Sequence, residues 1–169
     1  MLIGHLPAGY LAARYLWHRY GAERGLGWNH MLGAALLGNV FPDIDWLYYY
    51  LIDHRRHYHH AYWTHLPVFW LLVVPVVVLS LRFARHSRAA VIAGVFGAGA
   101  FLHLLLDSIA GRIWWLYPWV DEPFSLFAHD GMTGSSAFNF VLRCCTELAL
   151  LSAATYIYVR SRNPAPWES

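Results

Sequence analysis

GAGAFLHLLLDSIAGRIWWLYP, residues 97–118, is an apolar run interrupted by one histidine and one aspartate, His103 and Asp107. Residues four apart lie on the same face of an α-helix, so the run predicts an imidazole beside a carboxylate in apolar surroundings. A carboxylate in such surroundings needs a compensating partner. For this pair alone two interpretations stay open: a metal ion bound by both groups, or a buried hydrogen-bonded pair.

The composition around this run is typical of a membrane protein. The chain has 169 residues, of which 58% are hydrophobic and 13% are charged. Soluble domains are about half apolar and about one quarter charged. We therefore expect an all-α fold, a polytopic membrane bundle of about five helices. Residues 1–160 would form one integral membrane domain, and residues 161–169 would form a polar C-terminal tail.

Apolar segments of helical length predict the individual helices. They are Leu2–Tyr20, Trp28–Pro42, Leu66–Phe83, Ala89–Ala110 and Ala137–Val159. The second segment is short, roughly 20 Å at 1.5 Å per residue. We therefore expect the sequence PDID at positions 42–45, which breaks this helix, to lie within the membrane boundary. The aromatic segment WLYYYLI that follows is expected at the membrane interface.

The arginines predict the orientation of the bundle, because cytoplasmic loops of membrane proteins carry an excess of basic residues. One side has Arg14, Arg19, Arg24, Arg82, Arg85, Arg88, Arg160 and Arg162, and the other has Arg55, Arg56 and Arg112. This count predicts an N-terminus outside and a C-terminus inside the cell. The basic residues lie at helix ends and form no continuous face, so no nucleic-acid partner is expected.

Histidines and aspartates gather on the predicted extracytoplasmic side. They are His5, Asp43, Asp45, His60, His65, His103 and Asp107. Simpler roles exist for some of them: His5 as a polar end, and Asp43 and Asp45 as a turn or cap. The histidines between His54 and His59 fit an interfacial or pH-responsive loop. A mixed set of imidazoles and carboxylates suits zinc, manganese or iron, and such open sites support hydrolysis.

The order of these motifs resembles a known family. Gly4-His5, then PDID, then the H-x-x-x-T-H of residues 60–65, then the H-x-x-x-D-x-x-x-G that begins at His103 resemble the YdjM-type family of membrane-bound, metal-dependent hydrolases. These are the LexA-regulated inner-membrane proteins. The resemblance covers about residues 1–118 and implies a distant relation to the zinc-dependent phospholipase C and P1 nuclease group.

The resemblance implies the metal ligands residue by residue. They would be His5, Asp43 or Asp45, His60, His65, His103 and Asp107, with Asp107 able to bridge two ions. The chain departs from the family pattern H-R-G-x-T-H-S, because Ala61, Tyr62 and Leu66 stand where that pattern has Arg, Gly and Ser. A third ion is not expected, since downstream only His129, Asp130 and Glu147 could bind one.

These observations predict an inner-membrane hydrolase that uses a divalent metal, zinc first, with manganese or iron as alternatives. Asp43, Asp45 and His60 are the candidate catalytic residues, and the substrate would be a phosphoester or related ester, including a membrane lipid. The alternative functions are a non-enzymatic membrane protein that binds metal or haem, and a pH-sensing structural membrane protein. Arg143 and Glu147, four apart in the last helix, would either pin that helix or serve the site.

Overall fold

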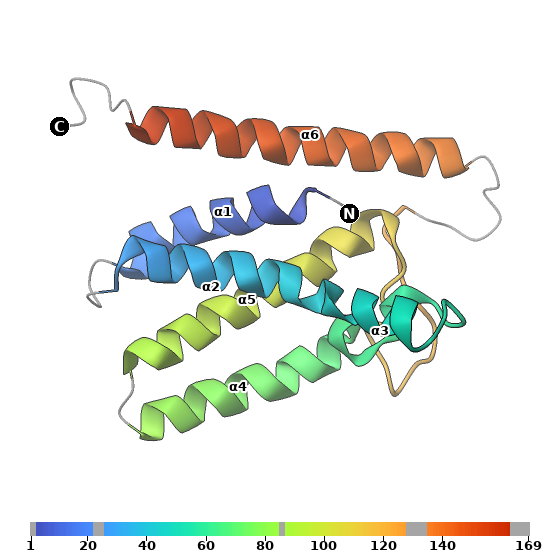
Figure 1. The fold of residues 1–169 in the computed structure, drawn as a ribbon, viewed down its shortest axis with the longest axis horizontal. Helices are drawn as coiled ribbons and strands as arrows, with labels where there is room; N and C mark the ends of the chain where they lie inside the picture. Colours follow the sequence, from blue (N-terminus) through green and yellow to red (C-terminus); the bar gives the residue numbers. More distant parts are fainter. Residues whose placement is uncertain (1–2, 22–25, 85–86, 128–134, 163–169) are drawn as a thin grey trace.

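The protein is built from helices (Figure 1). The computed structural model describes residues 3–21, 26–84, 87–127 and 135–162, and in these ranges the only strand-like pairing is an isolated bridge between Ile113 and Phe124. The elements are α1 (His5–Leu16), α2 (Trp28–Val40), α3 (Asp45–Leu51), α4 (Pro67–Phe83), α5 (Ser87–Ala110) and α6 (Ser135–Arg162). The expected all-α fold is confirmed.

Helix α2 ends at Val40, just before the PDID segment as expected, but the chain stays helical after it. A 3-10 turn, Phe41–Ile44, continues the chain from α2 directly into α3, so the aromatic segment after it is helical. Pro42 is tolerated because it stands in the first turn, where its missing N–H has no intrahelical partner to lose. Asp43 and Asp45 therefore lie on consecutive helical turns. The first helix is also shorter than expected, since α1 ends at Leu16 and a π-helical turn follows.

Two of the expected membrane spans are supported by length. Among the described residues, Ser87–Ile109 in α5 and Ala137–Ser161 in α6 are long and apolar enough to cross a membrane. The apolar α4 has 17 residues, and α1 and α2 have 12 and 13. The expectation of five spans therefore holds by length only for α5 and α6.

The centre of the bundle is a close crossing of α2 and α5. A Cβ added at Gly38 would lie 2.0 Å from the carbonyl oxygen of Phe96, and one added at Gly99 would lie 2.7 Å from that of Ala35. Small residues allow two helix backbones to approach this closely. As a result, the end of α2 lies directly beside the residues that precede His103 on α5.

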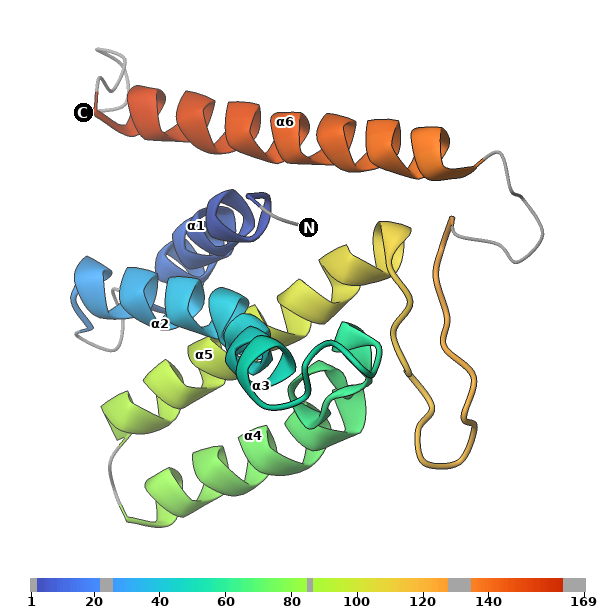
Figure 2. The ribbon, with the colours of Figure 1, turned by 45° about the vertical axis from the view of Figure 1, so that its right-hand side comes forward.

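Helix α6 lies at the edge of the bundle next to α1 (Figures 1 and 2), where Tyr158 contacts Tyr10. Only 6% of its candidate membrane window is buried within the protein. Large apolar side chains such as Phe140, Val141 and Leu148 are exposed along it. Such a surface suits contact with lipid hydrocarbon, which requires no hydrogen bonds from side chains.

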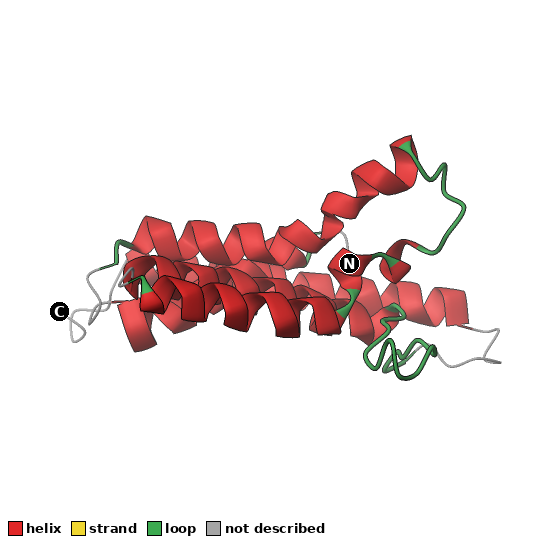
Figure 3. Ribbon diagram, turned by 90° about the horizontal axis from the view of Figure 1, so that it is seen from below, coloured by secondary structure: helices red, strands yellow, loops and turns green. Residues whose placement is uncertain are grey.

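The starts of α1 and α4 and the ends of α2 and α5 lie at the same end of the bundle (Figure 1). The loops that follow α3 and α5 are at this end, opposite the end marked by the C-terminus (Figure 3). The fold therefore brings four distant parts of the sequence to one place.

Candidate metal centre

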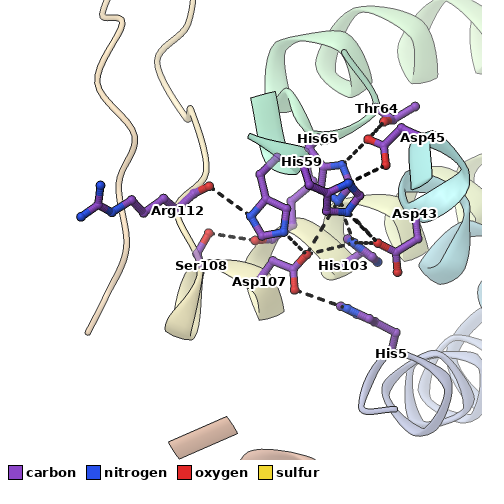
Figure 4. Close-up of polar contacts among 12 residues, drawn as sticks. His5, Asp43, Asp45, His59, Thr64, His65, His103, Asp107, Ser108 and Arg112 are labelled. Carbon is purple, nitrogen blue, oxygen red and sulfur yellow. Dashed lines mark hydrogen bonds and ion pairs between the residues drawn. The ribbon is translucent and has the colours of Figure 1, made fainter. Parts of the chain in front are cut away.

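The side chains of the expected ligands converge at this end of the bundle (Figure 4). All seven residues predicted from sequence are brought into one cluster, in which each has an imidazole or carboxylate within 4.0 Å of another member. They are His5, Asp43, Asp45, His60, His65, His103 and Asp107. Their roles as ligands or catalytic groups stay predictions, because proximity alone does not assign a role.

The imidazoles of His65 and His103 face each other through their Nε2 atoms. His65 Nε2 lies 3.3 Å from His103 Nε2. His103 Nδ1 donates to the backbone carbonyl of Asn39 at 2.8 Å, and His65 Nδ1 donates to Asp45 Oδ2 at 2.7 Å. In neutral imidazoles both Nε2 atoms are therefore acceptors, and two acceptors cannot hydrogen-bond each other. A shared cation resolves this arrangement.

The carboxylate of Asp107 lies against the same point. Its Oδ2 is 3.1 Å from His103 Nε2 and 3.8 Å from His65 Nε2, while its Oδ1 is 3.4 Å from His5 Nε2. Atoms that share one zinc ion at about 2.1 Å lie roughly 3.4 Å apart in tetrahedral geometry. The spacing of His65, His103 and Asp107 therefore fits a metal ion, and the two oxygens of Asp107 face different histidines.

His5 joins the cluster from the first turn of α1. It is buried, and its ring stacks on that of His103 with centroids 3.8 Å apart. The side-chain amide of Asn39 donates to the backbone carbonyl of His5, which fixes the start of α1 against α2. Among the described residues, His5 Nδ1 is buried without a hydrogen-bond partner. A buried nitrogen in this state is available to a ligand such as a metal ion.

The two aspartates of the PDID segment differ in their surroundings. Asp45 is buried and accepts hydrogen bonds from Thr64 Oγ1 and His65 Nδ1, so it orients His65 from behind. Burial alone would raise the pKa of Asp45, but hydrogen bonds from His59 and His65 outweigh it and lower the pKa to about 2. Asp43 is 30% exposed, and its Oδ1 lies 3.7 Å from His103 Nε2. Asp43 is thus the carboxylate on the open side.

His59 is a member of the cluster that sequence reasoning missed. Its Nε2 lies 3.4 Å from Asp43 Oδ1, and its Nδ1 lies 3.1 Å from Asp45 Oδ1. Burial lowers the pKa of His59, but the two carboxylates overcome this effect and raise the pKa to about 9. The only sequence signal for this role was its position directly before His60.

His60 occupies the other side of Asp107. Its Nδ1 donates to the backbone carbonyl of Arg112 at 3.2 Å, so its Nε2 presents a lone pair 3.5 Å from Asp107 Oδ2. Burial lowers the pKa of His60 to about 3, against the opposing charge of Asp107. The imidazole is therefore neutral at pH 7, the form that binds metals.

Supporting hydrogen bonds come from residues that the sequence did not single out as functional. Thr64 and Asn39 hold Asp45, His5 and His103 in place, as described above. Asp53 stabilises the loop before the cluster by accepting bonds from the backbone N–H groups of Arg56 and His57 and from His57 Nδ1. Burial alone would raise the pKa of Asp53, but the hydrogen bonds outweigh burial and lower the pKa. Hydrogen bonds such as those of Thr64 and Asn39, made behind the candidate ligand atoms, orient metal ligands.

The donor set as a whole fits a divalent transition metal. Three groups of potential ligand atoms, each within 4.8 Å of one another, are His59 with His60 and His65, His5 with Asp43 and His103, and His65 with His103 and Asp107. Neutral nitrogens with carboxylate oxygens suit zinc, manganese or iron. Of the downstream residues, Glu147 Oε1 accepts from the backbone N–H of Ile3 at 3.2 Å, whereas His129 and Asp130 lie outside the described residues.

A pocket of about 600 Å³ opens beside the cluster. It is lined on the cluster side by Asp43, His59, His60 and Asp107, and on the opposite side by residues of α6 that include Arg143 and Glu147. A small molecule can therefore reach the cluster.

Comparison with known proteins shows the family of the chain. No curated protein and no solved structure matches the chain. The expected relation to phospholipase C and P1 nuclease is therefore still a prediction. One family model, described as YdjM inner membrane protein, matches residues 1–165, nearly the whole chain. The chain therefore belongs to the YdjM inner membrane protein family, and it is a membrane protein.

Proposed function

We propose that this membrane protein is a hydrolase that depends on a divalent metal, with zinc as the first candidate and manganese or iron as alternatives. The observation that carries the proposal is the pair of Nε2 lone pairs of His65 and His103, 3.3 Å apart with Asp107 Oδ2 beside them. His65, His103 and Asp107 would hold the ion, and His5, Asp43 and His60 would complete or support the site. Such an ion supplies an acidified water and a positive charge for a phosphoryl or carbonyl oxygen.

The residues of the chain divide the remaining work. Asp43 faces the pocket, so we assign it the proton of the attacking water. Its Oδ1 lies 3.4 Å from His59 Nε2, which keeps the carboxylate in place. Asp45, behind His65, acts by orienting that imidazole. His60 lies on the pocket wall, and the lone pair of its neutral Nε2 is available to the ion.

Metal content is the deciding measurement for this proposal. Plasma mass spectrometry of the detergent-purified protein should find one or two zinc, manganese or iron ions per chain. The double variant His103→Ala/Asp107→Ala should lose them. His30→Ala is a matched control, because His30 is exposed on the first turns of α2, away from the cluster. Absence of metal from the wild type, even after supplementation, would exclude the hydrolase proposal and favour a pH-responsive or structural role.

We also propose that the site faces the extracytoplasmic side. Apart from Arg143, the described arginines fall into two groups: six belong to the helix ends opposite the cluster (Arg14, Arg19, Arg82, Arg88, Arg160 and Arg162), and three follow α3 or α5 at the cluster end (Arg55, Arg56 and Arg112). This distribution suits the positive-inside rule. Alkaline phosphatase is active only outside the cytoplasm, so a fusion after Arg162 should be inactive. A fusion within the loop between α5 and α6 should be active. The reverse pattern would place the site inside the cell.

A further inference from the structure

Helix α6 forms the outer wall of the pocket beside the cluster. The pocket measures about 600 Å³ and receives Phe140, Arg143, Cys144 and Glu147 from α6. Residues 140, 143, 144 and 147 follow the spacing of one helix face. The same face therefore carries every α6 residue that lines the pocket, and it is directed at the candidate metal centre.

The two walls of the pocket carry different polar groups. The inner wall presents acceptors from Asp43, His60 and Asp107, which would hold a cation. The outer wall presents Arg143, whose guanidinium matches phosphate oxygens with paired N–H donors, and Glu147, which accepts a hydrogen bond from the backbone N–H of Ile3. An anionic group placed between a metal ion and this guanidinium would be attracted from both sides.

The position of Arg143 within a candidate membrane span is a second reason to connect it with function. It lies in Ala137–Ser161, where charged side chains are costly and generally serve a site or an ion pair. Glu147, one turn further along, accepts a hydrogen bond from the backbone N–H of Ile3. Glu147 thus attaches α6 to the start of the chain, next to His5, and this contact positions Arg143 over the pocket.

Part of the lining is apolar. Trp46, Leu106 and Phe140 also line the pocket, and α6 presents exposed apolar side chains along most of its length. In a bilayer the outer side of this wall would meet lipid hydrocarbon. A molecule with one phosphate and one hydrocarbon tail would satisfy both the charged and the apolar parts of the pocket.

We propose that Arg143 binds the phosphate of a lipid phosphoester and that α6 selects this substrate class. The proposal rests on the hydrolase function proposed above, since it names the substrate of the same site. Phosphate recognition is the shared chemistry of lipid and soluble phosphoesters, and the apolar lining favours the lipid. The competing interpretation is that Arg143 serves only to hold α6 through neighbours on its own helix.

Occupancy of the pocket can be measured without any turnover. The chain has two cysteines, and Cys144 lines the pocket whereas Cys145 is exposed and does not line it. In a Cys145→Ser background Cys144 is the single thiol. Short-chain phosphatidic acid should slow the maleimide labelling of Cys144, whereas diacylglycerol and glycerol phosphate should do so only at much higher concentration. The Cys144→Ser protein, labelled at Cys145, should show no such protection.

Substitution of Arg143 then tests recognition itself. Arg143→Gln should raise the phosphatidic acid concentration required for protection by about tenfold or more, and Arg143→Lys should raise it less, since lysine keeps the charge without the paired donors. Arg160→Gln is the matched control, because it removes the same charge from the same helix about 25 Å away at 1.5 Å per residue. Arg160 bonds to Tyr156 and does not line the pocket.

The outcomes separate the proposals. Equal protection of wild type and Arg143→Gln, equal protection by diacylglycerol or by glycerol phosphate, or no protection in the wild type would each overturn the lipid-phosphate assignment. Metal content is measured on every variant and should be unchanged by Arg143→Gln, since that side chain is not a candidate ligand. Absence of metal from the wild type would instead reject the hydrolase proposal, whatever the labelling shows. If Arg143→Gln does not fold, Arg143→Lys is measured in its place. Protection of Cys144 equal to that in the wild type would then overturn the assignment.

Discussion

At the scale of single residues, the cluster is organised by which nitrogen of each histidine carries the proton. His60, His65 and His103 all donate from Nδ1, to a backbone carbonyl or to Asp45, and present Nε2 to the centre. The sequence indicated the residue types, because His103 and Asp107 share one helix face. It could not indicate these tautomers, since Asn39 and Arg112 contribute backbone oxygens and any residue has one.

Asp45 should affect metal affinity by orienting His65 and not by binding the ion directly. We expect Asp45→Asn to weaken metal affinity by about 10- to 100-fold, because an amide no longer fixes the His65 tautomer as a carboxylate does. Competition with a chelator of known affinity measures the change. Asp121→Asn is the control, since Asp121 is an exposed carboxylate that bonds only to Trp114 among the contacts described for it. Equal affinities in wild type and Asp45→Asn would contradict the orienting role.

His59 gives the metal-free protein a pH dependence. Its folded-state pKa of about 9 lies above the ordinary value of 6.5, so its contribution to stability is fully present below pH 6.5 and is lost as the pH rises through about 9. The melting temperature of the metal-free wild type in detergent should therefore fall between pH 7 and 9.5. His59→Gln should show a flatter profile over this range. Parallel profiles would show that the carboxylates do not hold His59 protonated.

At the scale of elements, apolar runs predicted the long helices well, because a span of lipid-compatible side chains is a strong and continuous signal. They did not predict α3, because Pro42 was interpreted as a break although it occupies the first turn of a helical segment. They also did not place His59, which lies in a loop without periodicity. Residues 143 and 147 could be assigned to one face, but the neighbour of that face depends on tertiary packing.

The crossing of α2 and α5 should be intolerant of any added side chain. Gly38→Ala should destabilise the protein by about 1–3 kcal/mol, since the new methyl group would collide with the backbone at Phe96. Metal content should fall as well, because the crossing places α2 beside His103. Gly33→Ala, on the same helix with nothing within 4 Å of the added Cβ, should be neutral or slightly stabilising. Unfolding in detergent mixtures compares the two, and equal effects would show that the crossing can relax.

At the scale of the whole molecule, the proposed metal ion would join residues that lie far apart in the sequence and belong to different helices. His5 belongs to α1, Asp43 follows α2, His65 precedes α4, and His103 and Asp107 belong to α5. An ion held by these residues would stabilise the folded arrangement of all four helices, because it binds the assembled site and not the unfolded chain.

Metal should therefore raise the stability of the protein. At a free metal concentration one hundred times the dissociation constant, we expect a gain of about 2.7 kcal/mol. Melting temperatures with metal and with chelator measure it. The His103→Ala/Asp107→Ala variant should show no gain, and a similar gain in that variant would mean that the ion binds elsewhere.

The spread of the cluster along the chain has a consequence for biosynthesis. Its members lie between residues 5 and 107, whereas the pocket wall that bears Arg143 belongs to α6, the last helix in the sequence. All of the cluster residues are therefore synthesised before α6. The wall of the pocket that bears Arg143 is thus the last part of the pocket to be made, and an ion that bound the cluster before α6 was made would meet a site open on that side.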